Sequence, residues 1–192
     1  MVRNQYLLAV AIAATVAATP AAAQVLNDAD RFVKAARERD AATAMEVLNS
    51  RGLAIIDARD AKGDTALVLA MARRDEDWAG YLLSQGANPN AAARNGDTPL
   101  IAAARVGFST GATQLVARRA KVDLANRMGE TALIVAVQQR QLPIIRLLLA
   151  AGADPDKTDN AAGYSARDYA KRDTRSREIL KLIEAAKPAA RP

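Results

Sequence analysis

The chain has 192 residues, a formal net charge of +6, and neither cysteine nor histidine. These absences exclude a Ser-His-Asp triad, a cysteine nucleophile, a disulfide framework and any zinc or haem site that uses histidine. A basic balance can indicate nucleic-acid binding, but the chain has only seven aromatic residues. That is too few for extensive base stacking, so nucleic acid is not the expected partner.

Residues 1–23 have the layout of a secretory signal peptide. Arg3 gives a positive start, residues 7–18 form an apolar run, and Ala23 ends a stretch of small residues at the usual cleavage offset. The run is well short of the ~18–20 apolar residues needed to cross a bilayer, which argues against a membrane anchor. We therefore expect cleavage after Ala23 and export to the periplasm or the medium. In an exported protein the basic charge favours an anionic envelope component or an acidic protein partner, or it serves solubility alone.

A glycine, an acidic residue and a threonine recur at intervals of 33 residues through the rest of the chain. The three copies lie at 63–65, 96–98 and 129–131, and a related Gly-Tyr-Ser at 163–165 follows one residue late. Leucines and alanines keep the same register; these are Leu67, Leu100, Leu133, Ala70, Ala103, Ala136 and, one residue late, Ala170. Self-similarity at such a period predicts stacked units, each of which buries its apolar face against its neighbours.

Each unit is predicted to contain two short helices. In the second unit Thr65 is placed to accept a hydrogen bond from the free amides of a first helix that runs to about Arg73. A second helix is expected at about 76–85, and Gly86 should end it in the left-handed conformation that glycine adopts most easily. The Asn-Pro-Asn at 88–90 and the Asp-Pro-Asp at 154–156 cannot be helical and should form protruding turns.

This pattern resembles the ankyrin repeat, in which a hairpin finger precedes two antiparallel helices. The resemblance rests on Gly-Asp-Thr-Pro-Leu at 96–100 and on the near duplicates at 86–90 and 152–156. It implies an all-α, ankyrin-like solenoid of about five stacked helix-turn-helix units with short hairpin fingers. The repeat domain is expected at 29–186, after a short leader at 24–28 and before a flexible tail at 187–192, with units at about 29–59, 60–92, 93–125, 126–158 and 159–186. The first and last units are degenerate, as the end caps of a solenoid need to be.

Two features depart from the family pattern. The histidine of the family's first helix is replaced by apolar residues and, in the last unit, by an acid, so packing must substitute for its hydrogen bonds. These residues are Val68, Ile101, Ile134 and Asp168. In the third unit, Gly111 interrupts the expected second helix, and Arg119 stands where other units have glycine. We therefore expect residues 109–122 to be the least stable internal segment.

Other candidate sites have simpler structural interpretations. The acidic run at 75–77 is placed to cap a second helix rather than to act as a catalytic pair. The aspartates within 154–159 lack the ligand spacing of a calcium loop, so no metal site is expected. Trp78 and Tyr81 occupy apolar repeat positions, and we favour packing over a ligand cage for them. With no glycine-rich phosphate loop either, the sequence predicts no enzyme activity and no cofactor.

The resemblance also indicates where a partner would bind. In the ankyrin family the fingers and the first helices line a concave face, and contacts come from its variable positions. On this chain those positions fall at the finger tips, just after the repeat glycine, and late in the first helices. The tip residues are Lys62, Arg94, Asn95, Arg127 and Met128; those after the glycine are Asp64, Asp97, Glu130 and Tyr164; those of the helices are Arg73, Arg105, Val106, Gln138 and Gln139.

Two interpretations stay open for the four arginines of this set, which are Arg73, Arg94, Arg105 and Arg127. They form a concave wall that grips the carboxylates of a partner, or each pairs with an acid of its own unit, such as Asp97 or Glu130, and does no more. We expect a monomeric, non-catalytic protein–protein interaction module of the cell envelope. The alternative partner is an anionic envelope component, a lipid head group or a polysaccharide. Binding that is lost at raised salt would favour this alternative, whereas salt-tolerant capture of one protein would favour an interface with an apolar centre at Met128, Val106 and Tyr164.

Overall fold

The computed structural model describes residues 20–173 and 177–186 of the chain. The elements of this part are helical, with isolated β-bridges in place of strands. They are α1 (Pro20–Glu38), α2 (Ala41–Arg51), the 3-10 helix η1 (Gly52–Ile55), α3 (Ala66–Ala72), α4 (Glu76–Ser84), α5 (Pro99–Val106), α6 (Ser109–Ala117), α7 (Ala132–Gln138), α8 (Leu142–Ala150), α9 (Ala166–Arg172) and α10 (Arg177–Ala185). Most of the predicted signal peptide, residues 1–19, and the tail at 187–192 lie outside the described residues, whereas the predicted leader at 24–28 is part of α1. α1 begins at Pro20 and runs through the predicted cleavage point after Ala23.

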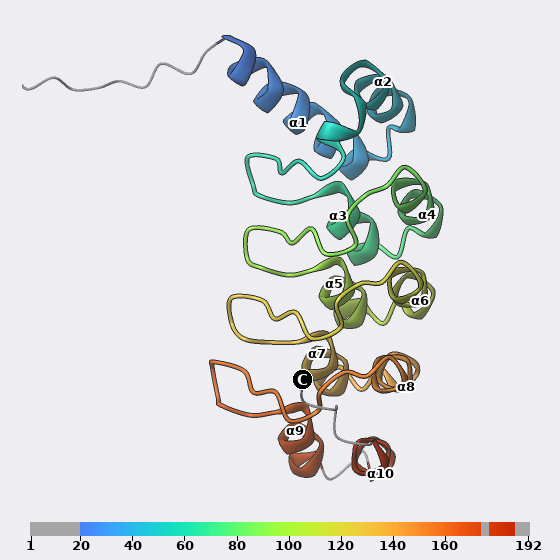
Figure 1. Cartoon of the computed structure of the whole chain (residues 1–192), viewed down its shortest axis with the longest axis vertical. Helices are drawn as coiled ribbons and strands as arrows, with labels where there is room; N and C mark the ends of the chain where they lie inside the picture. The colour runs from blue at the N-terminus through green and yellow to red at the C-terminus, as the bar shows by residue number, and fades with distance from the viewer. Residues whose placement is uncertain (1–19, 174–176, 187–192) are drawn as a thin grey trace, which may run out of the picture.

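The helices form two columns along the length of the molecule (Figure 1). The first helix of each pair, α1, α3, α5, α7 and α9, stacks in one column, and the second helices stand beside them in the other. Long loops project from the first column and lie one above another as fingers (Figure 1). The predicted all-α solenoid of stacked helix pairs with fingers is therefore confirmed.

The first helices begin where a hydroxyl can cap them. The side chains of Thr65, Thr98 and Thr131 each accept a hydrogen bond from the amide three residues later, at 3.2–3.3 Å. All three threonines are buried, so each hydroxyl satisfies an amide that water cannot reach. Ser165 does the same in the last unit and forms a capping box with Asp168. The repeated threonine is thus a start signal for the inner column.

A single apolar core runs through the whole stack. The aligned leucines and alanines are buried, and the alanines let paired helices approach closely. Val68, Ile101 and Ile134, which replace the family's histidine, are buried too, so packing does substitute for its hydrogen bonds. This core positions the first helices at a regular spacing and so fixes the surface that they share with the fingers.

The fingers are held in register by backbone hydrogen bonds between neighbours. The amide of Arg94 donates to the carbonyl of Gly63 at 2.7 Å, and the amide of Asn160 donates to the carbonyl of Met128 at 2.8 Å. Glycine is required beside these contacts: Gly96 has a φ of 85°, and a β-carbon there would lie 2.7 Å from the backbone nitrogen of Arg127. The tips are therefore a preformed row rather than a set of independent loops.

The turns after the second helices are packed, which corrects the expectation that they protrude. Asp57, Asn90 and Asp123, spaced 33 residues apart, each accept a hydrogen bond from a backbone amide 31 residues further on, at 2.8–2.9 Å. Each turn is thus tied to the next unit, and Pro155 is buried. The Asn-Pro-Asn and Asp-Pro-Asp segments are non-helical as predicted, but their role is to join units.

The third unit differs from expectation at one of its two unusual residues. Gly111 does not interrupt a helix, because α6 is continuous from Ser109 to Ala117. Gly111 is instead buried under Phe108, whose ring atoms would lie 2.4 Å from a β-carbon at that position. Arg119 does adopt the predicted left-handed conformation, with a φ of 59° against 89° for Gly86 and 85° for Gly152.

Candidate functional site

A continuous groove runs between the fingers of the second, third and fourth units and the first helices of the second and third units. It consists of three hollows of about 410, 200 and 710 Å³ that share lining residues. Asn95 lines all three hollows, and Asp64, Asp97, Arg105 and Arg127 each line two of them. We call this surface the inner groove. Its other lining residues are Lys62, Val68, Leu69, Ala72, Ala93, Arg94, Ala102, Val106, Asn126, Met128 and Glu130.

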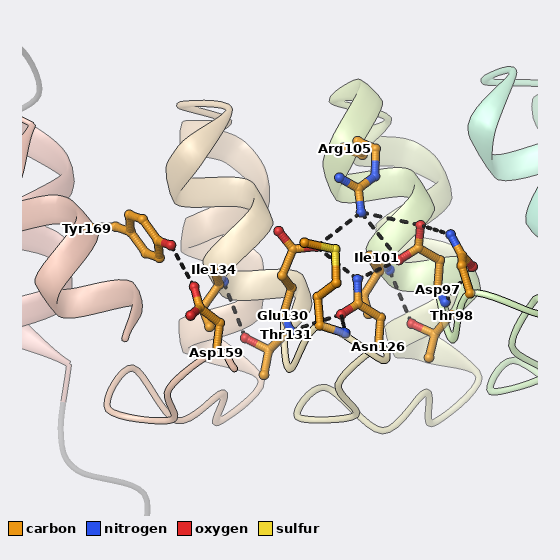
Figure 2. Close-up of polar contacts among 12 residues, drawn as sticks. Asp97, Thr98, Ile101, Arg105, Asn126, Glu130, Thr131, Ile134, Asp159 and Tyr169 are labelled. Atoms are coloured by element: carbon orange, nitrogen blue, oxygen red, sulfur yellow. Dashed lines mark hydrogen bonds and ion pairs between the residues drawn. The ribbon is translucent and has the colours of Figure 1, made fainter. Parts of the chain in front are cut away.

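The floor of the inner groove contains a closed polar network that joins two units (Figure 2). The guanidinium of Arg105 lies 3.3 Å from Asp97 and 3.5 Å from Glu130. The side-chain amide of Asn126 donates to the same two carboxylates at 2.8 Å each. Arg105 therefore follows the second interpretation in the sequence, in which an arginine pairs with nearby acids, and it bridges neighbouring units as well. Its charge is largely committed before any partner arrives.

A second arginine pairing, unforeseen in the sequence, holds the two acids in the finger of the second unit. Arg37, at the end of α1, lies 2.5 Å from Asp60 and 3.0 Å from Asp64. Arg73, one of the predicted partner-binding residues, lies just past the end of α3 and donates to the backbone carbonyls of Arg37 and Ala36. Arg73 thus satisfies free carbonyls at the end of α1 and lines none of the three hollows.

The finger tips keep the uncommitted positive charge. Lys62, Arg94 and Arg127 are exposed, line one hollow together, and form no ion pair with any described residue. The guanidinium of Arg94 donates to the backbone carbonyl of Ala61, at 3.0 Å. Met128, at the tip of the finger of the fourth unit, has 55% of its surface exposed. A row of cations with an exposed apolar side chain at one end is thus the part of the inner groove that is free to bind.

Three predicted residues of the last two units, Gln138, Gln139 and Tyr164, do not join the inner groove. Gln138 lines a separate hollow with Arg140 and Arg172. Gln139 and Tyr164 line neither this hollow nor the inner groove. The ring of Tyr164 lies 4.5 Å beneath the guanidinium of Arg172 and packs edge-on against Tyr169. Tyr164 therefore contributes to the packing of the C-terminal cap.

The aspartates within 154–159 are used structurally. Asp156 pairs with Arg167 at 2.6 Å, which lowers the pKa of Asp156. Burial alone would raise the pKa of Asp159, but hydrogen bonds from the Tyr169 hydroxyl and from three backbone amides outweigh it and hold the pKa below its usual value. Asp154 accepts a hydrogen bond from the amide of Asp156 at 2.9 Å. Among the described residues no three potential metal ligands come together.

A weaker periodic signal would have identified Asn126. Asp60, Asn126 and Asp159 occupy the same position of their units, and each accepts hydrogen bonds from amides of its own finger. The third unit has Ala93 at this position and uses Asn95 instead, whose side chain accepts from the amide of Asp97. The recurrence of an aspartate or asparagine at this position was not recognised in the sequence, because the third unit has alanine there.

Comparison with known protein families agrees with the geometry. A model described as "Ankyrin repeats (3 copies)" matches residues 81–159, and a model described as "Ankyrin repeat" matches residues 62–94. No curated protein matches the chain significantly. In the part of the chain that the structure describes, none of the helices combines the length and the apolar character needed to span a bilayer.

The two matches together cover residues 62–159, which include the whole inner groove. Domains of this kind are typically non-catalytic and mediate contacts between proteins. The stacked helix pairs, the capped first helices and the finger register account for these matches residue by residue. The chain belongs to the ankyrin repeat family.

Proposed function

We propose that the chain is a non-catalytic binding module of the cell envelope that holds a protein partner in its inner groove. The observation that carries this is the separation of charge within the groove. The acids of the floor already pair with Arg37 and Arg105 and accept hydrogen bonds from Asn126, while the cations of the finger tips remain exposed and make no ion pair with any described residue. An acidic partner would therefore meet free arginine and lysine at the tips.

The shape of the groove supports binding without a large rearrangement. The tips are fixed by finger-to-finger backbone hydrogen bonds, and the floor is fixed by the Arg105 network. A surface ordered before binding loses little conformational freedom, so more of the contact energy appears as affinity. The groove also has apolar walls, from Val68, Leu69 and Val106, which can take an apolar side chain of the partner.

A protein partner fits the groove better than a polyanion does. Beneath the tip cations lie Asp64, Asp97 and Glu130, all of which line the hollows. A densely anionic lipid surface or polysaccharide would bring negative charge against this row of acids. A protein segment can instead place acidic side chains at the tips and neutral or apolar ones over the floor.

The test is affinity capture from an envelope extract with the purified protein as bait. The variant combines Lys62→Glu and Arg127→Glu, which reverse two exposed tip charges without touching the Arg105 network. The matched control combines Lys121→Glu and Lys181→Glu, because both lysines are exposed and line none of the three hollows. We expect one protein, identified by mass spectrometry, to be retained by the wild type and the control and lost by the tip variant.

Salt dependence separates the two candidate partners. Exposed charge contacts are screened at raised ionic strength, so a polyanion held only by the tips should be released steeply between ~0.1 and ~1 M salt. A protein that also buries Met128 and the apolar walls should be retained to a larger extent. Enrichment of lipid or polysaccharide alone, lost with salt and with the tip variant, would replace the protein partner by the anionic envelope component as the ligand.

Export is a separate part of the proposal and has its own test. It rests on the signal-like layout of residues 1–23 and on the absence of cysteine. Cell fractionation followed by N-terminal sequencing should find the protein in the periplasm or medium with Gln24 as its first residue. An unprocessed chain in the cytoplasm would remove the envelope from the proposed function and leave the binding module.

A further inference from the structure

Another hollow lies beside the column of second helices, away from the inner groove. It is a cavity of about 330 Å³ between α2 and α4, and we call it the outer groove. Its lining residues are Ala35, Arg39, Ala41, Met45, Asp75, Asp77, Trp78 and Tyr81. The cavity exists because α4, α6 and α8 each pack against the next second helix, whereas α2 packs mainly on α1 and η1.

The walls of the outer groove are aromatic and apolar. The rings of Trp78 and Tyr81 are stacked with their centroids 5.2 Å apart, and both side chains are half-buried. Met45 on the facing helix is 39% exposed, although most of the large apolar side chains of the described residues are covered. Packing was the interpretation favoured for Trp78 and Tyr81 from the sequence. Their rings do pack on each other, but they also line this cavity.

The repeat itself does not require these aromatic side chains. At the position of Trp78 the next two units have Gly111 and Ile144, and both are accommodated in regular second helices. At the position of Tyr81 they have a glutamine and a leucine. The aromatic pair is therefore a property of the second unit alone and not a condition for stacking.

The charged residues that line the outer groove are two carboxylates, Asp75 and Asp77, and one cation, Arg39. Asp75 is committed, because it caps α4 and lies 3.2 Å from Arg39. Asp77 is exposed and makes no ion pair with any described residue.

We propose that the outer groove binds an organic cation with a hydrocarbon body, such as an alkylammonium. Its hydrocarbon would lie against Met45 and the aromatic pair, and its charge would lie near Asp77. Aromatic faces attract cations, and a nearby carboxylate adds to this attraction. The cavity has the size of a small-ligand site, so the occupant is a free alkylammonium or a single lysine side chain of a partner.

The experiment uses the intrinsic fluorescence of Trp78, the chain's single tryptophan. The purified protein is titrated with hexyltrimethylammonium, with neutral 1-hexanol and with anionic hexanoate. We expect a saturable change in emission with the ammonium, at an affinity about tenfold higher than for the alcohol, and no saturable change with hexanoate. Blocked N-acetyl-lysine methylamide distinguishes the two sources: a response to it shows that a lysine side chain can enter, and a response to the quaternary ammonium alone restricts the site to free cations.

A matched pair of variants tests the role of charge. Asp77→Asn should weaken ammonium binding about fivefold, the effect of one partly exposed charge contact. Glu76→Gln removes a carboxylate from the same helical turn but lines no part of the cavity, so it should change the affinity less than about twofold. Equal responses to all three hexyl compounds, equal effects of the two variants, or no saturation at ~10 mM ammonium would overturn the proposal.

Discussion

Arg119→Gly should stabilise the protein, because Arg119 occupies a conformation that favours glycine. Its φ is 59°, and the equivalent residues of the units on either side are Gly86 and Gly152. The Arg119 side chain is exposed and forms no ion pair with any described residue, so little is lost when it is removed. The substitution therefore tests whether backbone strain is stored at the end of α6.

The expected gain follows from two opposing terms. A non-glycine residue in the left-handed region costs ~1–2 kcal/mol, and glycine removes this cost. Glycine also gives the unfolded chain more freedom, which costs ~0.4–1 kcal/mol. The net stabilisation should be ~0.5–1 kcal/mol, or a rise of ~1–4 °C in Tm for a chain of this length.

Urea unfolding followed by circular dichroism and by Trp78 fluorescence measures this change. Arg119→Ala keeps the left-handed strain and should stay within ~0.5 kcal/mol of the wild type. Arg118→Gly is the opposite control: Arg118 has a φ of −91° and donates to the carbonyl of Leu83, so its loss should destabilise by ~1–2 kcal/mol. An Arg119→Gly protein no more stable than the wild type would refute the strain argument.

Three further predictions concern the fingers, the C-terminal cap and the third unit. Gly129→Ala should destabilise the protein by more than ~2 kcal/mol, because its φ is 77° and a β-carbon would lie 2.6 Å from a backbone nitrogen of the next finger. Gly163→Ala, which has open space around it, should cost only ~1 kcal/mol. Equal losses of stability in thermal unfolding would contradict the finger register. Because the pKa of Asp159 is lower in the folded protein than its ordinary value of 3.8, ionised Asp159 stabilises the fold at pH values above 3.8. This contribution is lost as the pH falls through the depressed pKa. Asp159→Asn should therefore be less stable than the wild type at neutral pH, with a gap that narrows below pH 3.8; a constant gap would exclude the linkage. Hydrogen exchange should be faster in residues 109–122 than in 142–151, and equal protection would show that the third unit is not weaker.

The fold was accessible from the sequence because its determinants repeat. The threonine caps, the buried leucines and the left-handed glycines each recur in several units, so accidental matches can be recognised. Gly111 was misjudged because helix propensity treats glycine as a break, whereas here the fold needs a residue without a β-carbon beneath Phe108. Tertiary packing overrode local propensity at this position.

The site was only partly accessible from the sequence. The positions of Lys62, Arg94 and Arg127 at the tips follow from the repeat register, and the structure brings them together around one hollow. The pairing of Arg105 with Asp97 and Glu130 was one of the two interpretations left open. The carbonyl partners of Arg73 did not follow, because a long side chain can reach several acids and carbonyls on neighbouring units. Trp78 and Tyr81 were the sequence signal of the outer groove, but the cavity also depends on how α2 and α4 lie relative to each other, which the sequence does not show.

Site-specific photocrosslinking from Met128 tests the central claim most directly. Met128 is 55% exposed and lines the inner groove, so a photoreactive residue placed there should capture the proposed partner in living cells. The control places the same photoreactive residue at Thr113, which is exposed on α6 in the column of second helices. The account predicts one crosslinked protein from position 128 and none from position 113. The same product from both positions, or a product from position 113 alone, would contradict binding in the inner groove.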